Sequence, residues 1–314
     1  MNLMVDKTNT YITKTHKGVY GIIRRENKIL LIKKARGPYT GLYDLPGGSP
    51  EIGETETETL IREIKEETNC NCVSCEKRWE KTIYFSKFTK ECGETGCLAH
   101  TGVLFDVEID GVPSSMGDGL DSNGAEWIDE STLSMKNATP FVLIGIEKDV
   151  ISLSNDRGEL VDVGVRKQDI PDDRFPIISA VFLLRSTGKL VLQKIAYTKK
   201  TDAGKWSFSA GGHVDAGENY EQAALRELQE EMGVVAELDS YIGCIRKKRE
   251  NRPGAFFHGF KVFSDAIIIP DEKEVAESQE FTIDEVKEMI KENPNQFKDT
   301  FIQLFECFCK KEGL

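Results

Sequence analysis

The stretch GGSPEIGETETETLIREIKEETNC, residues 47–70, has a counterpart in GGHVDAGENYEQAALRELQEEMGV, residues 211–234. Glycines and charged residues recur at a constant offset of 164 residues, whereas most residues between them differ. The recurring pairs are Gly48 and Gly212, Glu54 and Glu218, Arg62 and Arg226, Glu63 and Glu227, Glu66 and Glu230, and Glu67 and Glu231. A repeat that keeps its charges while their neighbours change indicates that the charges are needed. It also predicts two similar domains.

Length and composition agree with two domains. A chain of 314 residues exceeds what one hydrophobic core usually organises. With 39% hydrophobic and 30% charged residues, the chain has the composition of a globular protein. We expect an N-terminal domain over residues 1–153 and a C-terminal domain over residues 154–314. The linker would lie in residues 154–176, and a short strand at Glu159–Gly164 would open the second domain.

Net charge restricts the class of ligand. A charge of −12 disfavours nucleic acid as the main partner, because affinity for a long polyanion comes largely from Lys and Arg. Small phosphorylated ligands remain open, since a bound divalent cation reverses the local sign of an acidic site. The sequence has neither a run of ~18 apolar residues nor an N-terminal signal segment. We therefore expect a cytoplasmic protein without membrane contact, and a homo-oligomer remains open.

The first copy carries the signals of an amphipathic helix. Thr55 and Glu58 are spaced as a capping box, in which each side chain bonds the other residue's backbone amide. Beyond it, Leu60 and Ile64 recur at a spacing of four residues, as in one buried helical stripe. These signals predict a helix over residues 56–68.

The second copy predicts the same helix from different residues. Asn219 and Gln222 can form the N-terminal cap. Gly233 suits a left-handed residue at the C-terminal end. The buried stripe would consist of Ala224, Leu228 and Met232.

Each predicted helix carries glutamates at i, i+3 and i+4, which share one face. Mg²⁺ and Mn²⁺ prefer such oxygen ligands and keep waters that a substrate's phosphates can displace. The glycine pairs Gly47-Gly48 and Gly211-Gly212 allow a tight loop and a close approach of a backbone carbonyl to a metal. A solvated, glutamate-rich helix face is the alternative for one copy alone. Its repetition favours two cation sites.

These residues resemble the Nudix box: Gly, five residues, Glu, seven residues, then Arg-Glu-aliphatic-x-Glu-Glu-x-Gly-aliphatic. Gly212 to Val234 matches at every fixed position. Gly48 to Cys70 differs only by Asn69 and Cys70 at its last two positions. Asn also suits a left-handed C-cap, and Cys packs as a small apolar residue. Both boxes therefore resemble competent ones.

The resemblance covers most of each half and implies an α/β fold. We expect two tandem Nudix-type α/β/α sandwich domains, each a mixed sheet between helices. Before each box, YGIIRRENKILLIKKA (residues 20–35) and ISAVFLLRSTGKLVLQKIA (residues 178–196) read as hairpins of apolar strands.

The segments just before the boxes differ between the halves. The first is GLYDLPGG, residues 41–48, and the second is GKWSFSAGG, residues 204–212. The second half resembles the Nudix branch that includes isopentenyl-diphosphate isomerase. The isomerase needs a catalytic Cys before its box, where this chain has Ser207, Ser209 and Ala210. We therefore expect no isomerase activity.

The resemblance also implies roles for the repeated residues. The metal ligands would be the carboxylates of Glu63, Glu66, Glu67, Glu227, Glu230 and Glu231, together with Gly48 and Gly212. One glutamate of each set can serve as the general base. Arg62 and Arg226 would pair with Glu54 and Glu218 and hold each loop on its helix. In many members the base lies in a later loop, for which the candidates are Asp121, Glu126, Glu274 and Glu277.

The implied reaction is metal-dependent hydrolysis of the diphosphate linkage in a nucleoside diphosphate joined to another moiety. The partner would be a small phosphorylated substrate, expected to be a nucleotide, and the cofactor Mg²⁺ or Mn²⁺. An alternative keeps one domain catalytic and makes the other a nucleotide-binding sensor or scaffold. Loops at residues 34–44, 86–98, 114–125 and 196–207 would select the substrate, and nothing in them names a base or sugar.

Other residues leave alternatives open. Cys72, Cys75, Cys92 and Cys97 are spaced either for a four-thiolate zinc site or for simple packing beside a strand. The basic run 246–249 with Arg252 suits either ligand phosphates or a solvated hairpin rim. His213 would contact substrate or solvent. Phe297, Phe301, Phe305 and Phe308 would cover the core from a C-terminal helix or form an interface.

Overall fold

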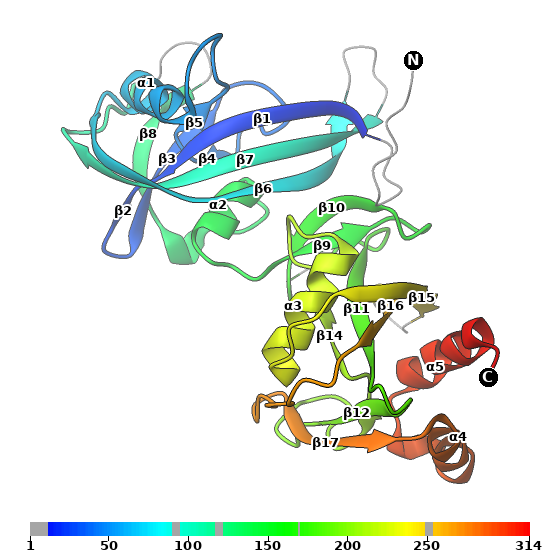
Figure 1. Ribbon diagram of the computed structural model, residues 1–314. Coiled ribbons are helices and arrows are strands. Elements are labelled where there is room, and N and C mark those ends of the chain that lie inside the picture. The colour runs from blue at the N-terminus through cyan, green and yellow to red at the C-terminus, as the bar shows by residue number, and fades with distance from the viewer. Residues whose placement is uncertain (1–11, 90–94, 117–121, 169, 249–253) are drawn as a thin grey trace. The chain divides into compact units, whose positions relative to one another are not determined.

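The computed structural model in Figure 1 describes residues 12–89, 95–116, 122–168, 170–248 and 254–314. The chain divides into two compact units, each with its own buried core. The first unit runs to Leu153 and also includes Glu159–Ile170 and Asp215–Gly217. The second unit consists of Ser154–Gly158, Pro171–Val214 and Glu218–Leu314.

The expected strand near Glu159–Gly164 forms, but it belongs to the first unit. Strand β10 spans Leu160–Val165 and follows β9, Val150–Ser154. Val163 and Val165 are buried in the same apolar cluster as Phe141, in the core of the first unit. Burial of these side chains therefore places the strand with the first unit rather than at the start of the second.

The first unit contains a mixed sheet around β1. Strand β1, Ile12–Ile22, pairs in parallel with β7, Thr95–Asp110, and antiparallel with β5, Gly47–Gly48. Strand β6, Asn71–Thr89, extends this sheet beyond β7. A second sheet is centred on β3 and comprises β2 (Arg24–Arg25), β3 (Lys28–Lys34), β4 (Tyr43–Asp44) and β8 (Ser122–Asp129).

Helices cover both faces of the first unit's strands. Helix α1, Glu56–Thr68, buries Leu60 and Ile64 against Val19 and other strand residues. Another apolar cluster joins Tyr20 to Phe141 of the short helix α2, Pro140–Gly145. A 3-10 turn, η1, spans Glu130–Thr132. Adjacent residues of β1 thus face opposite layers, as the two-residue period of a strand requires.

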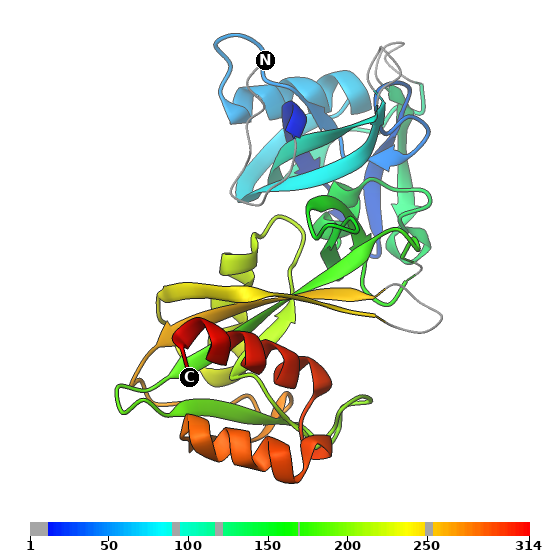
Figure 2. The same cartoon turned by 90° about the vertical axis from the view of Figure 1, so that its right-hand side faces the viewer.

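The second unit repeats this arrangement. Its central strand β11, Phe175–Leu184, pairs in parallel with β16, Ala255–Phe263, and antiparallel with β12 and β14. The remaining elements are β12 (Leu190–Ile195), β13 (Trp206–Ser207), β14 (Ala210–His213), α3 (Tyr220–Met232), β15 (Leu238–Lys247), β17 (Val275–Phe281), α4 (Ile283–Glu292), η2 (Pro294–Gln296) and α5 (Asp299–Glu312). Figures 1 and 2 show α3 and α5 on opposite faces of this sheet. The predicted α/β/α architecture is confirmed.

Both box helices begin and end where their sequences predict. Thr55 caps α1 and Asn219 caps α3, each in a reciprocal capping box. Asn69 and Gly233 end these helices with left-handed φ angles of 61° and 67°. A side chain is tolerated there when it is Asn, which explains why the altered end of the first box leaves the helix intact.

The C-terminal aromatic residues cover the core of the second unit. Phe297, Phe301, Phe305 and Phe308 are all buried in one apolar cluster with Phe182 of β11. Phe301 stacks on Phe182 with ring centroids 5.9 Å apart. The prediction of a core-covering C-terminal helix is therefore confirmed for α5.

Candidate active sites

Arg62 organises the carboxylates of the first box. Its Nε and Nη2 donate to the two oxygens of Glu54 over 2.7 and 2.9 Å. Its Nη1 donates to Glu63 over 2.8 Å and to Glu66 over 3.2 Å. Nη2 also donates to the Ser49 carbonyl. One guanidinium therefore fixes the loop and two glutamates of α1 in a single network.

Glu67 shares a helix face with Glu63 but is buried in the protein. It is 2% exposed, and its Oε2 accepts a 2.8 Å hydrogen bond from the Gly47 amide. Burial raises the pKa of this carboxyl to about 8, although the Gly47 amide and the charge of Lys34 act against the shift. Burial also raises the pKa of Glu63. The first box thus holds carboxyl groups that a nearby cation would stabilise in their charged form.

The second box has the same geometry. Arg226 donates to both oxygens of Glu218 over 2.8 and 3.0 Å, to Glu227 over 2.8 Å and to Glu230 over 3.1 Å. Glu231 is 8% exposed and accepts from the Gly211 amide over 2.9 Å. Gln193 donates to the same oxygen, an additional bond that the sequence did not reveal. Burial raises the pKa of Glu231 to about 7.

A side chain at the second position of each Gly-Gly pair would displace the first glutamate of the box. A Cβ on Gly48 would lie 2.3 Å from Oε1 of Glu63. A Cβ on Gly212 would lie 2.1 Å from the same atom of Glu227. The absence of a side chain therefore lets the first glutamate of each set lie against the loop backbone.

The donors suit a hard divalent cation in their chemistry. All are oxygen atoms. A positive charge nearby would stabilise the ionised form of the buried Glu67 and Glu231 carboxyls, whose pKa burial raises. In the described part of the chain, however, no three His, Cys, Asp or Glu side chains are gathered closely enough to hold a metal ion. Arg62 and Arg226 bridge the outer carboxylates instead.

The later-loop candidates for the base lie in different surroundings. Glu126 accepts a 2.9 Å hydrogen bond from the Tyr43 hydroxyl. Glu277 pairs with Lys194 over 2.8 Å, and Glu274 pairs with Lys199. The negative charge of Glu274 contributes to the raised pKa of Glu231, so Glu274 lies near the second box. Asp121 lies outside the described residues.

The prediction of a four-cysteine zinc site as one alternative is wrong, because Cys72 and Cys75 lie at one end of a hairpin and Cys97 lies at the other end. Cys72 and Cys75 are at the start of β6, opposite Ile109 and Val107 of β7. Cys97 lies at the other end of the hairpin, a separation of roughly 30 Å at the rise of a strand. Zinc–sulfur bonds of about 2.3 Å cannot span this distance. Cys92 lies outside the described residues.

Two further residues that the sequence offered as ligand contacts, Arg246 and His213, contact groups of the protein. The Arg246 guanidinium lies over the ring of Phe175, with its carbon 4.3 Å from the ring centroid. The carbonyl of His213 accepts a 2.9 Å hydrogen bond from Arg226, so this residue's backbone belongs to the box network. Arg249 and Arg252 lie outside the described residues.

A model of one protein family, described as the NUDIX domain, matches residues 14–140 and again residues 174–305. These ranges include most of both units. The chain belongs to the NUDIX family. The prediction of a tandem Nudix protein is thereby confirmed.

Curated relatives share shorter stretches with this Nudix chain. The ADP-ribose pyrophosphatase of Methanocaldococcus jannaschii is 58% identical over 50 residues, which cover 16% of this chain and 30% of the relative. An isopentenyl-diphosphate Delta-isomerase of Serratia proteamaculans is 48% identical over 59 residues, covering 19% and 33%. The chain thus spans about a third of the length of these relatives. A crystal structure from Deinococcus radiodurans is 22% identical, covers 51% of this chain and 99% of its own, and gives a TM-score of 0.42.

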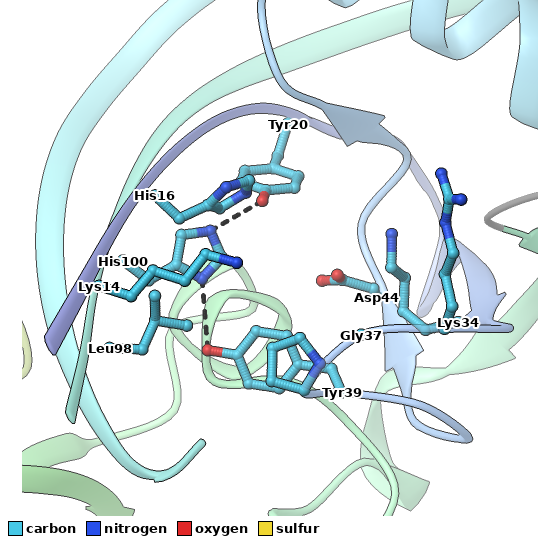
Figure 3. Close-up of a pocket in the computed structure, with 11 residues that line it drawn as sticks. Lys14, His16, Tyr20, Lys34, Gly37, Tyr39, Asp44, Leu98 and His100 are labelled. Carbon is cyan, nitrogen blue, oxygen red and sulfur yellow. Dashed lines mark hydrogen bonds between the residues drawn. The ribbon is translucent and has the colours of Figure 1, made fainter. Parts of the chain in front are cut away.

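The first Nudix domain has a cavity of about 410 Å³ that the sequence did not predict (Figure 3). It lies between β1, the end of β3, the following loop and β7. Its lining combines cationic, aromatic and imidazole side chains. The lining residues are Lys14, His16, Tyr20, Lys34, Arg36, Gly37, Pro38, Tyr39, Asp44, Leu98 and His100. Lys34 connects the cavity to the box, because its charge acts on the Glu67 carboxyl.

A chain of hydrogen bonds crosses this cavity. The Tyr20 hydroxyl lies 2.8 Å from Nε2 of His100, and the Tyr39 hydroxyl lies 3.3 Å from Nδ1 (Figure 3). Burial lowers the pKa of His100 to about 3, so its ring is neutral and has one N–H donor and one acceptor. One tyrosine hydroxyl therefore donates to the unprotonated ring nitrogen of His100, and the other accepts from the ring N–H. The accepting hydroxyl keeps its own proton, which it can donate to another group.

Gly18 makes this arrangement possible. A Cβ at Gly18 would lie 2.2 Å from the hydroxyl oxygen of Tyr20. The Tyr20 ring therefore folds back over β1 only because position 18 has no side chain. A glycine between alternating polar residues of a strand was the one sequence signal for this site.

The second Nudix domain has alanines at the corresponding positions. Tyr20 pairs with Gly47, and Ala180 pairs with Gly211 in the same way. Extending the strand register from there places Ala255 at the position of His100. Ala180 and Ala255 belong to a buried cluster with the aromatic side chains of Trp206, Phe208, Phe297 and Phe301. The tyrosine–histidine chain of the first domain therefore has no counterpart at these two positions of the second domain, whose Tyr241–His258 hydrogen bond lies elsewhere.

No helix in the described part of the chain is long and apolar enough to cross a membrane.

Proposed function

We propose that this protein is a Nudix pyrophosphohydrolase that uses Mg²⁺ or Mn²⁺ to split the diphosphate of a nucleoside diphosphate linked to another moiety. The observation that carries the proposal is the buried carboxyl of Glu67, held by the Gly47 amide beside Glu63 and Glu66. Glu231 and Gly211 repeat it in the second domain. The relative named ADP-ribose pyrophosphatase supports the substrate class.

In each domain the box glutamates and the carbonyl of the second glycine would hold the cation. A bound divalent cation neutralises phosphate oxygens and lowers the pKa of a bound water. Arg62 and Arg226 keep the outer glutamates and the loop in place through the bonds described above. The raised pKa values of Glu67 and Glu231 suit these groups to accept a proton near neutral pH.

Lys34 supports substrate binding in the first domain. It lies at the end of β3, lines the cavity and acts electrostatically on Glu67 and Asp44. Its ammonium group is a compact charge on a flexible side chain, so it can neutralise a phosphate between the box and the cavity without a fixed bonding geometry. The cavity beside it then holds the moiety that the diphosphate carries.

Paired substitutions test the proposal in the full-length protein. Glu66→Gln with Glu67→Gln, and Glu230→Gln with Glu231→Gln, keep side-chain size while removing charge. Each pair is expected to lower metal-dependent release of phosphate or nucleoside monophosphate by at least ~100-fold for some member of a nucleotide panel. The panel comprises nucleoside triphosphates, ADP-ribose, dinucleoside polyphosphates, nucleotide sugars and capped RNA.

Exposed glutamate side chains outside the two networks provide the controls. Glu51→Gln and Glu221→Gln change the same charge on exposed side chains and are expected to keep activity. Full activity in both paired variants would refute the hydrolase proposal.

A second candidate function gives catalysis to the first domain and nucleotide sensing or scaffolding to the second. The aromatic side chains packed around Ala180 and Ala255 favour the scaffold role for the second domain, because the first domain has a cavity at the corresponding positions. Under this alternative, Glu230→Gln with Glu231→Gln leaves every activity in the panel intact, whereas the first paired variant removes it.

A further inference from the structure

Gln193 lies on β12 and reaches the second box from the sheet. Side chains alternate along this strand, so Val191 packs in one apolar cluster with Leu228 of α3, whereas Leu192 packs in the cluster that includes α5. Gln193 therefore shares the face of Val191 and points toward α3. Its Nε2 donates a 2.9 Å hydrogen bond to Oε2 of Glu231, the buried carboxyl of the box.

The other polar atom of this side chain is unpaired. Gln193 is 5% exposed, and among the residues that the structure describes none donates a hydrogen bond to its Oε1. A buried polar atom without a partner costs stability, and native proteins keep such atoms where a bound ion or water, or a functional role, accounts for them. Because Nε2 of the same amide group is bonded to Glu231, Oε1 lies within a few ångströms of that carboxyl.

The first domain has an apolar residue at this position. In each domain the strand pairs with the short strand before the box, and Ile32 lies opposite Asp44 as Gln193 lies opposite Ser207. Ile32 is fully buried in the cluster that contains Leu60 of the first box helix. The shared fold therefore does not require a polar side chain here. This difference favours a role for Gln193 in ligand binding.

The separation of the polar atoms matches the coordination shell of a hard cation. Mg²⁺ and Mn²⁺ favour octahedral oxygen ligands, and bonds of about 2.1 Å place adjacent oxygens about 3 Å apart. Rotation about the last side-chain bond exchanges the nitrogen and oxygen of a glutamine amide. In Gln193 this rotation would bring Oε1 to the 2.9 Å position beside Oε2 of Glu231. Two oxygens at such a distance repel each other unless a cation lies between them.

We infer that Oε1 of Gln193 is an additional oxygen ligand of the divalent cation in the second domain, and that the amide turns from donor to ligand when the cation binds. The inference rests on the proposed function, which assigns this cation to Glu227, Glu230 and Glu231. It adds a ligand that lies outside the box, on β12, where the first domain has Ile32. The two domains thus bind their cations through different sets of ligands.

Mn²⁺ binding to the full chain tests this inference. Glu66→Gln with Glu67→Gln removes charge from the first box and gives the parent variant. Adding Glu230→Gln and Glu231→Gln gives the baseline without the second site. Electron paramagnetic resonance of free Mn²⁺ during a titration measures affinity without turnover. In the parent, Gln193→Ile introduces the residue of the first domain and is expected to weaken Mn²⁺ binding by about tenfold.

Gln193→Glu distinguishes a ligand from a hydrogen-bond donor. It keeps an oxygen at this position but loses the N–H group that bonds Glu231, so it is expected to bind Mn²⁺ at least as tightly as the parent. A residue that only oriented Glu231 would be impaired equally by Gln193→Glu and Gln193→Ile. Gln279→Ile is the matched control, because it makes the same change at an exposed position on β17 and is expected to leave binding unchanged.

Two results would overturn the inference and leave the proposed function intact: Mn²⁺ affinity of Gln193→Ile within about twofold of the parent, or binding by Gln193→Glu as weak as by Gln193→Ile. A parent that binds no more Mn²⁺ than the baseline would contradict the proposed cation itself, and the inference with it. Circular dichroism checks that each variant is folded. Gln193→Leu, which is closer in shape, replaces Gln193→Ile if the latter does not fold.

Discussion

The amide of Gly47 donates a 2.8 Å hydrogen bond to the buried carboxyl of Glu67, and this links the glycine loop to the helix of the first box. The second domain repeats the contact between Gly211 and Glu231 over 2.9 Å. The carboxyls of Glu67 and Glu231 thus face the core of their domains rather than solvent. In each proposed site, the charge state of this carboxyl would couple folding to cation binding.

The buried carboxyl of Glu67 predicts a pH-dependent stability in the presence of a chelator. Its pKa rises from 4.5 to about 8 on folding, so the folded protein binds the proton more tightly than the unfolded chain. The stabilisation is complete below the lower value and is lost as pH rises through the upper one. Between about pH 5 and pH 8 we expect the free energy of unfolding to fall by a few kcal/mol.

Glu67→Gln removes this titrating group and is expected to flatten the pH dependence of unfolding for the first domain. Glu231→Gln is the counterpart for the second domain, where the pKa rises to about 7. Scanning calorimetry at several pH values measures both. An unchanged pH dependence in Glu67→Gln would show that this carboxyl does not titrate as burial predicts.

Arg62→Lys is expected to lower kcat/KM of the first domain by at least about tenfold, with a small change in melting temperature. The guanidinium bonds Glu54, Glu63 and Glu66 together, whereas one ammonium cannot satisfy this geometry. Activity assays of Arg62→Lys and Arg226→Lys on separate substrates measure the effect for each domain. Unchanged kinetics would mean that the network does not position the glutamates.

Gly48→Ala and Gly212→Ala are expected to reduce activity strongly without unfolding the protein. The added methyl groups would lie 2.3 and 2.1 Å from carboxylate oxygens of Glu63 and Glu227, so these side chains must move. Gly243→Ala is the control, because its added methyl would meet only Cys307, at 3.8 Å. Kinetics with thermal melting measure both effects, and a fully active Gly48→Ala would contradict the close contact.

Phe301→Ala is expected to destabilise the second domain by about 3–5 kcal/mol, because it opens a cavity in a packed core. Its ring is fully buried and stacks between Phe182 and Phe297. Phe263→Ala, at a side chain that is 50% exposed, is the control. Denaturant unfolding gives both values. A loss below about 1 kcal/mol in Phe301→Ala would place this aromatic cluster outside the core.

Local signals in the sequence determined the two box helices. Capping boxes at Thr55 and Asn219 and left-handed ends at Asn69 and Gly233 act within one or two helical turns. The Arg–Glu pairs could also be anticipated, because the same charges recur in both copies. Each of these features depends on residues close together in the chain.

Tertiary structure alone decided the ligand cavity, the separation of the cysteines and the unit to which β10 belongs. Tyr20 and His100 meet because β1 and β7 pair in parallel across a long stretch of chain, and the loop after β3 brings Tyr39 to the same imidazole. Antiparallel pairing of β6 with β7 puts Cys72 and Cys97 at opposite ends of that hairpin. Spacing along a sequence does not reveal such distances, because strand register is set by packing between distant segments.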